Sequence, residues 1–166
     1  MVLVDRFGRP VTSIRISVTK RCNLNCFFCH REGIKGEEDT FYPEDFENLF
    51  KAAKELGIKK VKFTGGEPLE RDDLEDIIKR ARNYFEDISL TTNGTKLKGR
   101  AKDLYLAGLN RINISLQSLK PEVYKRITGR DTLKNVLEGI EDARNTPLNP
   151  IKINYVLMKG LNDSEF

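Results

Sequence analysis

The sequence predicts an α/β fold in which a parallel sheet alternates with helices. Five segments alternate apolar and polar residues at a period of two, as strands do: 13–18, 60–64, 87–91, 111–116 and 151–157. Helix-like segments separate them, so strands and helices alternate along the chain. Strands connected through helices lie parallel, with right-handed crossovers. The 166 residues suffice for one such domain with a substantial core, and not comfortably for two.

The helices are recognised by apolar residues that recur every three or four positions. Helical patterns cover 43–57, 71–85 and 131–144, a helix around 97–107 ends at Gly108, and a short helix begins at Pro121. The predicted buried stripes are Phe46, Leu49, Phe50, Ala53 and Leu56; Leu74, Ile77, Ile78 and Ala81; and Leu133, Val136, Leu137 and Ile140. These stripes are expected to cover the sheet.

Each strand carries an apolar face and a polar face. The apolar face consists of Ile14, Ile16, Val18, Val61, Phe63, Ile88, Leu90, Ile112, Ile114, Leu116, Ile151, Ile153 and Tyr155. The polar face consists of Arg15, Ser17, Lys62, Thr64, Ser89, Thr91, Asn113, Ser115, Lys152 and Asn154. A buried polar face needs partners, which favours a curved sheet whose concave side is a polar cavity filled by ligand and water.

Three cations, Arg15, Lys62 and Lys152, then point into this cavity, so the ligand is expected to be anionic. The alternative is an open sheet with one solvated face. Open parallel sheets are nearly always covered on both faces, so the cavity is the favoured interpretation.

Composition restricts the function classes. No apolar run approaches the length of a membrane span, and the first residues lack the pattern of a secretory signal, so we expect a cytoplasmic protein without a membrane partner. The net charge of +4 comes from 29 basic and 25 acidic residues. The basic residues are spread over strands and helices rather than gathered in a stripe with aromatics, which speaks against a nucleic-acid partner.

All three cysteines lie just after the first strand, in the pattern C-x3-C-x2-C formed by Cys22, Cys26 and Cys29. In a reducing compartment, clustered thiols are metal ligands or redox groups more often than disulfides. Three thiolates suit three corners of a [4Fe–4S] cluster and leave the fourth iron open. A zinc site is the alternative, but its fourth ligand would be His30, and adjacent residues rarely both reach one tetrahedral ion.

This pattern, with Phe28 before the third cysteine, resembles the radical S-adenosylmethionine enzymes. The stretch "TGGEP" at 64–68, after the second strand, strengthens the resemblance. In that family the open iron binds the methionine amino and carboxylate groups, and the Gly-Gly-Glu-Pro stretch holds the amino group. Glycines let the backbone approach a ligand closely, and a glutamate can accept a hydrogen bond from an ammonium group.

A narrower resemblance covers residues 1–166. The stretches "DRFGRP", "RISVTKRCNLNCFFC", "KFTGGEPL", "LTTNGTKL", "AGLNRINISLQSL", "ITGRD" and "KINYVLMKGLND" line up in order with the GTP 3′,8-cyclases. The resemblance implies an incomplete (βα)6 TIM-like barrel, here with about five βα units of the radical S-adenosylmethionine core. It makes Cys22, Cys26 and Cys29 the cluster ligands. It implies that S-adenosylmethionine is bound by Phe28, Gly65, Gly66, Glu67 and Ser115. It implies that GTP is bound by Arg15, Lys62, Thr91 and Lys152.

The implied reaction converts GTP to (8S)-3′,8-cyclo-7,8-dihydroguanosine 5′-triphosphate, the first step of molybdopterin synthesis, with an external one-electron donor. Three departures stand out: Gln117 replaces a frequent Asp, Lys62 replaces a frequent Arg, and the family's second C-x2-C…C cluster has no counterpart. The chain is therefore expected to be an N-terminal fragment or a truncated member that does not cyclise GTP by itself. The alternatives are a radical enzyme with another substrate and a non-catalytic zinc-binding fragment. The sequence leaves the oligomeric state open, a homodimer included.

Overall fold

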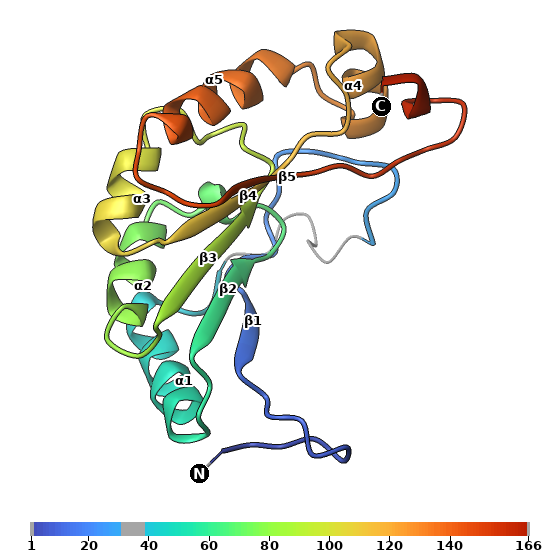
Figure 1. Cartoon of the computed structure of the whole chain (residues 1–166). Helices are drawn as coiled ribbons and strands as arrows, with labels where there is room; N and C mark the ends of the chain where they lie inside the picture. Colours follow the sequence, from blue (N-terminus) through green and yellow to red (C-terminus); the bar gives the residue numbers. More distant parts are fainter. Residues whose placement is uncertain (1, 31–38, 166) are drawn as a thin grey trace.

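The structure, a computed structural model, describes residues 2–30 and 39–165 and is built on one parallel five-stranded sheet (Figure 1). The strands are β1 (Ser13–Ser17), β2 (Lys60–Thr64), β3 (Asp87–Thr92), β4 (Arg111–Ser115) and β5 (Ile151–Asn154), and they neighbour one another in chain order. The helices are α1 (Pro43–Glu55), α2 (Leu74–Ala81), α3 (Ala101–Ala107), α4 (Pro121–Thr128) and α5 (Leu133–Arg144), with 3-10 turns η1 (Pro68–Glu70) and η2 (Asp163–Glu165). The predicted α/β class with a parallel sheet is confirmed.

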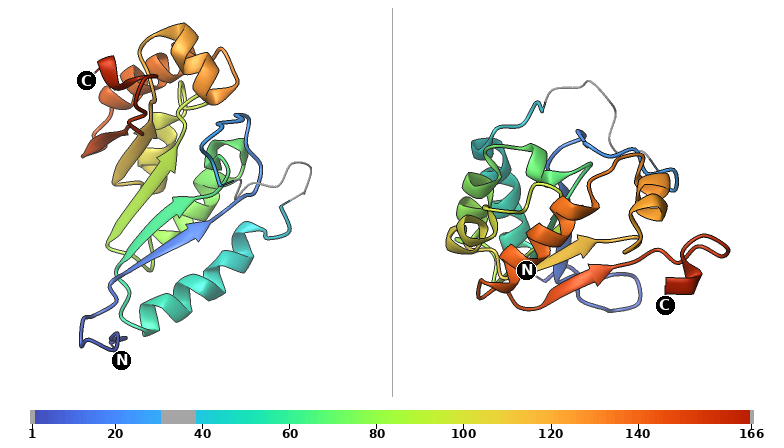
Figure 2. Two further views of the ribbon diagram at one scale, coloured as in Figure 1. Left: turned by 90° about the vertical axis from the view of Figure 1, so that its right-hand side faces the viewer. Right: turned by 90° about the horizontal axis from the view of Figure 1, so that it is seen from above.

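The helices cover one face of the sheet. In Figure 1, α1, α2, α3 and α5 follow one another along the same side, and α1 contacts α2, α2 contacts α3 and α3 contacts α5. Figure 2 shows that, in the part of the chain described, the opposite face of the strands carries no helix. The short helix α4 lies beyond the carboxyl end of β4. None of the described helices is long and apolar enough to cross a membrane.

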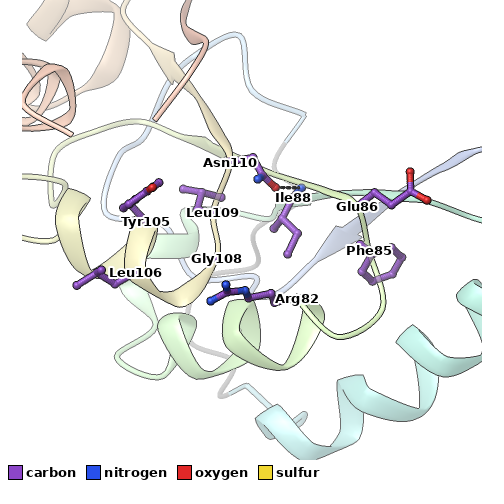
Figure 3. A pocket seen from close by; sticks show the side chains of 9 residues that line it. All are labelled: Arg82, Phe85, Glu86, Ile88, Tyr105, Leu106, Gly108, Leu109 and Asn110. Carbon is purple, nitrogen blue, oxygen red and sulfur yellow. Dashed lines mark hydrogen bonds between the residues drawn. The ribbon is translucent and has the colours of Figure 1, made fainter. Parts of the chain in front are cut away.

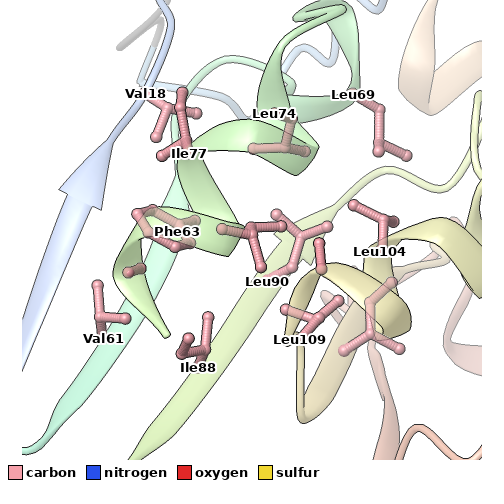
Figure 4. Packing of buried hydrophobic residues seen from close by; sticks show 14 of the residues in the cluster. Val18, Val61, Phe63, Leu69, Leu74, Ile77, Ile88, Leu90, Leu104 and Leu109 are labelled. Atoms are coloured by element: carbon pink, nitrogen blue, oxygen red, sulfur yellow. The ribbon is translucent and has the colours of Figure 1, made fainter. Parts of the chain in front are cut away.

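The hydrophobic core lies between the sheet and this helical layer (Figure 4). Its aromatic part is centred on Phe50 of α1, which is fully buried. The Phe50 ring lies 5.5 Å from that of Phe85 and 6.0 Å from that of Phe63, both in edge-on geometry. Such pairs add stabilisation beyond the area they bury, so α1 is held firmly against β2 and the end of α2.

The apolar strand residues of β2, β3 and β4 are buried as predicted, but four predicted core residues are exposed: Leu49, Leu56, Leu137 and Ile153. Ile153 is 46% exposed because β5 is an edge strand. Leu49 borders a surface hollow beside β1. Leu137 is exposed because the buried stripe of α5 passes through Gly139, whose Cα lies so close to the loop after β3 that an added Cβ would come within 2.7 Å of the Gly94 carbonyl oxygen.

The strand β5 ends three residues earlier than predicted. The backbone N–H of Val156 donates to Oε1 of Gln117 at 2.7 Å, and the Val156 carbonyl accepts from Nδ2 of Asn162 at 2.9 Å. The Tyr155 hydroxyl donates to the Asn162 carbonyl. Side chains therefore satisfy the backbone groups that a longer strand would have paired with a neighbour.

Candidate functional site

The three cysteines lie in the loop that follows the carboxyl end of β1. Cys22 and Cys29 are exposed and Cys26 is half-buried, so none of the three residues is closed off from solvent. The N–H of Cys29 donates to the Cys26 carbonyl at 3.1 Å, which closes a turn between the last two cysteines. The carboxyl edge of a parallel sheet is where such folds build their sites, as expected from the sequence.

The cysteine loop is anchored on the carboxyl-terminal end of α4. The backbone N–H groups of Asn25 and Phe27 donate to the carbonyls of Thr128 and Ile127, at 2.9 and 3.2 Å. Gly129, in the left-handed conformation (φ 72°), ends the helix, and Asn25 lies so close that a Cβ at this glycine would come within 3.3 Å of it. The loop thus supplies partners for carbonyls that a helix end leaves unpaired.

Burial disfavours the charged form of two of the three thiols. Burial raises the pKa of the Cys26 thiol to about 11, and the neighbouring thiols of Cys22 and Cys29 raise it further. Burial also raises the pKa of Cys22. The thiols of Cys22 and Cys26 are therefore protonated at neutral pH when nothing compensates their charge, and a metal centre that binds them must displace the protons.

The donor set fits an iron–sulfur cluster by its chemistry, because it consists of soft thiolates without a carboxylate among them. Within residues 2–30 and 39–165, no three His, Cys, Asp or Glu side chains are grouped tightly enough to hold a metal ion as they stand. Cys22, Cys26 and Cys29 nevertheless share one loop, and their binding to a common metal centre stays a prediction.

The two glycines after β2 pack against the segment that leads to Cys22. A Cβ at Gly66 would come within 2.2 Å of the Arg21 carbonyl oxygen, and one at Gly65 within 2.4 Å of the Thr19 carbonyl oxygen. The N–H of Gly66 donates to the Thr19 carbonyl at 2.9 Å. The close approach that the glycines permit in this structure is to the protein backbone, and their contact with a ligand stays a prediction.

Glu67 is buried, with 1% of its surface exposed, and the protein supplies its hydrogen-bond donors. Its Oε1 accepts from the Leu69 N–H and the Thr92 hydroxyl, at 3.0 and 2.5 Å, and its Oε2 accepts from the Asn93 N–H at 2.6 Å. Burial raises the pKa of Glu67 to about 7, against the opposing effect of these donors. The carboxylate thus joins the loop after β2 to the loop after β3, and a contact with an ammonium ligand stays a prediction.

The predicted cations lie on the uncovered face of the sheet. Arg15 and Lys62 are register partners across β1 and β2. Lys152 is the register partner of Asn113, which pairs in turn with Thr91. Among the described residues, no side chain forms an ion pair or hydrogen bond with any of these three cations, so their charges are available to an anion.

A fourth cation on this face, Arg111, is already neutralised. Its Nε donates to Oδ1 of Asp87 at 2.8 Å in a two-point ion pair between β3 and β4. This pair was not predicted from the sequence, although opposite charges at the first positions of β3 and β4 are a usable signal. Arg111 therefore differs from Arg15, Lys62 and Lys152, whose pairing with an anion stays a prediction.

The remaining predicted residues border the same region. Ser115 ends β4, half-buried, with Asn154 of β5 as its register partner. Phe28 is half-buried in the cysteine loop and meets the exposed ring of Phe27 edge-on, at 6.1 Å. Gln117 is buried, where its backbone carbonyl accepts from Asn162 and its side chain from Val156. Gln117, which stands where the related cyclases often have Asp, therefore holds the segment that follows β5 in place.

A separate hollow of about 430 Å³ opens at the opposite end of the sheet (Figure 3). It lies between the end of α2, the start of β3 and the end of α3, and Arg82 reaches across it with its stem packed on Gly108. The hollow is at the amino edge of the strands, away from the cysteine loop. It is not part of the candidate site.

Comparison with known proteins agrees with this geometry. Residues 16–166 match the Radical SAM superfamily. The chain is 58% identical over 165 residues to a probable GTP 3′,8-cyclase of Thermococcus kodakarensis, covering 99% of this chain and 53% of that protein. It is 56% identical over 164 residues to one of Pyrococcus abyssi, with the same coverage. The chain thus spans about half the length of the curated relatives it matches.

Solved structures share the fold at low sequence identity. TYW1 with a lysine-pyruvate adduct bound superposes with a TM-score of 0.69 at 22% identity, covering 91% of this chain and 57% of that one. The enzyme anSMEcpe with bound AdoMet superposes with a TM-score of 0.68 at 20% identity, covering 88% and 43%. The matched family, the cysteine pattern and the barrel-like βα order agree, and the chain belongs to the radical SAM superfamily, whose members use a [4Fe–4S] cluster and S-adenosylmethionine.

Proposed function

We propose that this chain is the cofactor-binding part of a GTP 3′,8-cyclase, which converts GTP to (8S)-3′,8-cyclo-7,8-dihydroguanosine 5′-triphosphate for molybdopterin synthesis. The observation that carries the proposal is the set of cations Arg15, Lys62 and Lys152 on the uncovered sheet face, none of which pairs with a side chain among the described residues. A triphosphate is the ligand whose charge this set would balance. The names of the relatives from Thermococcus and Pyrococcus support the same substrate.

In this proposal Cys22, Cys26 and Cys29 hold the cluster, which with an external electron donor supplies the 5′-deoxyadenosyl radical when S-adenosylmethionine is bound. Phe28, Gly65, Gly66, Glu67 and Ser115 form the surroundings of S-adenosylmethionine. The cations bind the triphosphate, and Thr91 contacts the nucleotide from β3. The protein's part is to bind, to orient and to exclude water, because the cofactors carry the reactive chemistry.

The proposed cluster is tested by anaerobic reconstitution with iron and sulfide. We expect about four irons per chain and broad visible absorption, both lost when any one of Cys22, Cys26 or Cys29 is changed to Ser. The matched control is His30→Ala, next to Cys29. It should keep the full iron content, because the histidine is not a ligand. One zinc per chain, no colour and loss of the metal in His30→Ala would instead establish a zinc site with three cysteines and a histidine.

The substrate is tested by titrating GTP and guanosine into the chain. Changing Arg15, Lys62 or Lys152 to Ala should weaken GTP binding by roughly ten- to hundredfold each, because each change removes a charge-assisted contact to phosphate. Guanosine binding should change little. Lys51→Ala, on the exposed side of α1, is the control and should leave both affinities unchanged. Equal losses for GTP and guanosine would show that the cations do not contact the phosphates.

A further inference from the structure

Three side chains near the cysteines form a closed ring of hydrogen bonds. Nδ2 of Asn23 donates to Oγ1 of Thr95 at 2.8 Å. That hydroxyl donates to Oδ1 of Asn93 at 2.7 Å, and Nδ2 of Asn93 donates back to Oδ1 of Asn23 at 2.8 Å. Each group donates to the next in the same sense, an arrangement in which hydrogen bonds polarise and strengthen one another.

The ring joins two segments that lie 70 residues apart in the sequence. Asn23 directly follows Cys22 in the cysteine loop, whereas Asn93 and Thr95 belong to the loop after β3. The three residues are largely shielded, Thr95 with 8% of its surface exposed. Bonds in such a setting hold their geometry better than bonds at the surface.

The ring extends to the loop after β2 through Glu67. The backbone N–H of Asn93 donates to Oε2 of this carboxylate at 2.6 Å, and the hydroxyl of the preceding Thr92 donates to Oε1. On its other side, the N–H of Glu67 donates to the Arg21 carbonyl at 2.7 Å. The loops after β1, β2 and β3 are therefore connected in one hydrogen-bonded circuit around the start of the cysteine loop.

Asn23 adds a constraint that the backbone of the cysteine loop does not supply. The bonds from Asn25 and Phe27 fix the later part of the loop to α4, and the bonds of residues 19–21 fix the chain before Cys22. The side chain of Asn23 ties the point between these two anchors to the carboxyl edge of β3. The length and direction of the Asn23 side chain therefore constrain the position of Cys22 relative to the loops after β2 and β3.

We propose that the Asn23–Thr95–Asn93 ring is a positioning device that sets the cysteine loop against the S-adenosylmethionine-binding loops. The inference rests on the proposed function, because it presumes a cluster on the cysteines and S-adenosylmethionine beside Gly66. The ring contributes no ligand to either cofactor. Its effect is on the distance and orientation between them, to which binding of S-adenosylmethionine at an iron of the cluster is sensitive.

The test compares Thr95→Val with Thr95→Ser in the reconstituted chain. Valine keeps the shape of threonine but removes the hydroxyl and so breaks two of the three ring bonds, whereas serine keeps the hydroxyl. We expect Thr95→Val to retain about four irons per chain while its dissociation constant for S-adenosylmethionine rises about tenfold. The change that S-adenosylmethionine causes in the electron paramagnetic resonance spectrum of the reduced cluster should shrink in parallel. Thr95→Ser should restore both readouts.

A double-variant cycle separates the ring from independent effects. Asn23→Ala should match Thr95→Val, and the two changes together should cost little more than either alone, because each opens the same ring. Asn145→Ala removes an asparagine side-chain bond at the end of α5, away from the site, and should leave affinity and spectrum unchanged.

Three outcomes would overturn the inference. Wild-type affinity and spectrum in Thr95→Val, with only a loss of folding stability, would show that the ring is merely structural. Loss of iron in Thr95→Val would show that the ring holds the ligands themselves and not their placement against the other cofactor. If the wild-type chain assembles no four-iron cluster, the proposed function fails and this inference fails with it. Reconstitution of the wild-type chain shows this before any variant is made.

Discussion

Replacing Gly66 by Ala is expected to prevent cluster assembly and to lower the free energy of unfolding by about 3 kcal/mol. The added Cβ would lie 2.2 Å from the carbonyl oxygen of Arg21 and 2.7 Å from its carbonyl carbon. Both are backbone atoms, so no flexible side chain can move aside. The clash is relieved when residues 19–21 shift away from Gly66. We expect this shift to move the thiol of Cys22 away from those of Cys26 and Cys29.

The measurements are iron content after anaerobic reconstitution and chemical denaturation of the metal-free chain. Gly99→Ala is the control, because a Cβ there meets nothing within 4 Å. Its backbone is left-handed (φ 79°), so it should cost about 1 kcal/mol of strain and leave the iron content unchanged. Full iron content in Gly66→Ala, with stability equal to that of Gly99→Ala, would show that residues 19–21 are not held as close as the structure places them.

Glu67→Gln is expected to remove a pH dependence of stability that the wild-type chain shows between about pH 4.5 and 7. Burial raises the pKa of Glu67 from 4.5 to about 7 in the folded chain. Between these values the folded state binds a proton that the unfolded state does not. The stabilisation is therefore complete below the unfolded pKa and is lost as the pH rises through the folded pKa, by about 3 kcal/mol in total.

Denaturation curves of wild type and Glu67→Gln, measured from pH 4.5 to 8, test this expectation. The wild-type chain should lose about 3 kcal/mol relative to the glutamine variant over that range. Glu86→Gln is the control, since Glu86 is exposed and pairs with Lys59 at the surface, and its curve should run parallel to wild type. Parallel curves for Glu67→Gln as well would mean that the hydrogen bonds from Thr92 and Asn93 outweigh burial and keep the carboxylate ionised throughout.

The local pattern sufficed for the helices and strands, and it predicts metal binding by the cysteine loop. Period-two alternation located the five strands to within a few residues, because one face of each strand meets a core and the other does not. The spacing of Cys22, Cys26 and Cys29 pointed to a metal centre without any knowledge of the fold. The polar face of the sheet, with Arg15, Lys62 and Lys152, was also readable, since strand parity decides which side a residue faces.

Contacts between residues far apart in the sequence decide the features that the local pattern does not predict. Whether Glu67 meets a ligand or the protein depends on Thr92 and Asn93, which lie 25 and 26 residues further along and reach it only once β2 and β3 pair. The early end of β5 depends on Gln117, 39 residues before Val156. Propensity and periodicity carry no information on such pairings, because they describe a residue and its near neighbours.

The sequence by itself therefore determined the parallel α/β class, and it predicts a three-cysteine metal centre and an anionic ligand. Tertiary structure alone decided that Gly65 and Gly66 accommodate the backbone of residues 19–21, and that Asn23 closes a ring with Asn93 and Thr95. The physical reason is that short-range order follows from side-chain size, polarity and spacing. The geometry of a site instead follows from which loops meet at the edge of the assembled sheet.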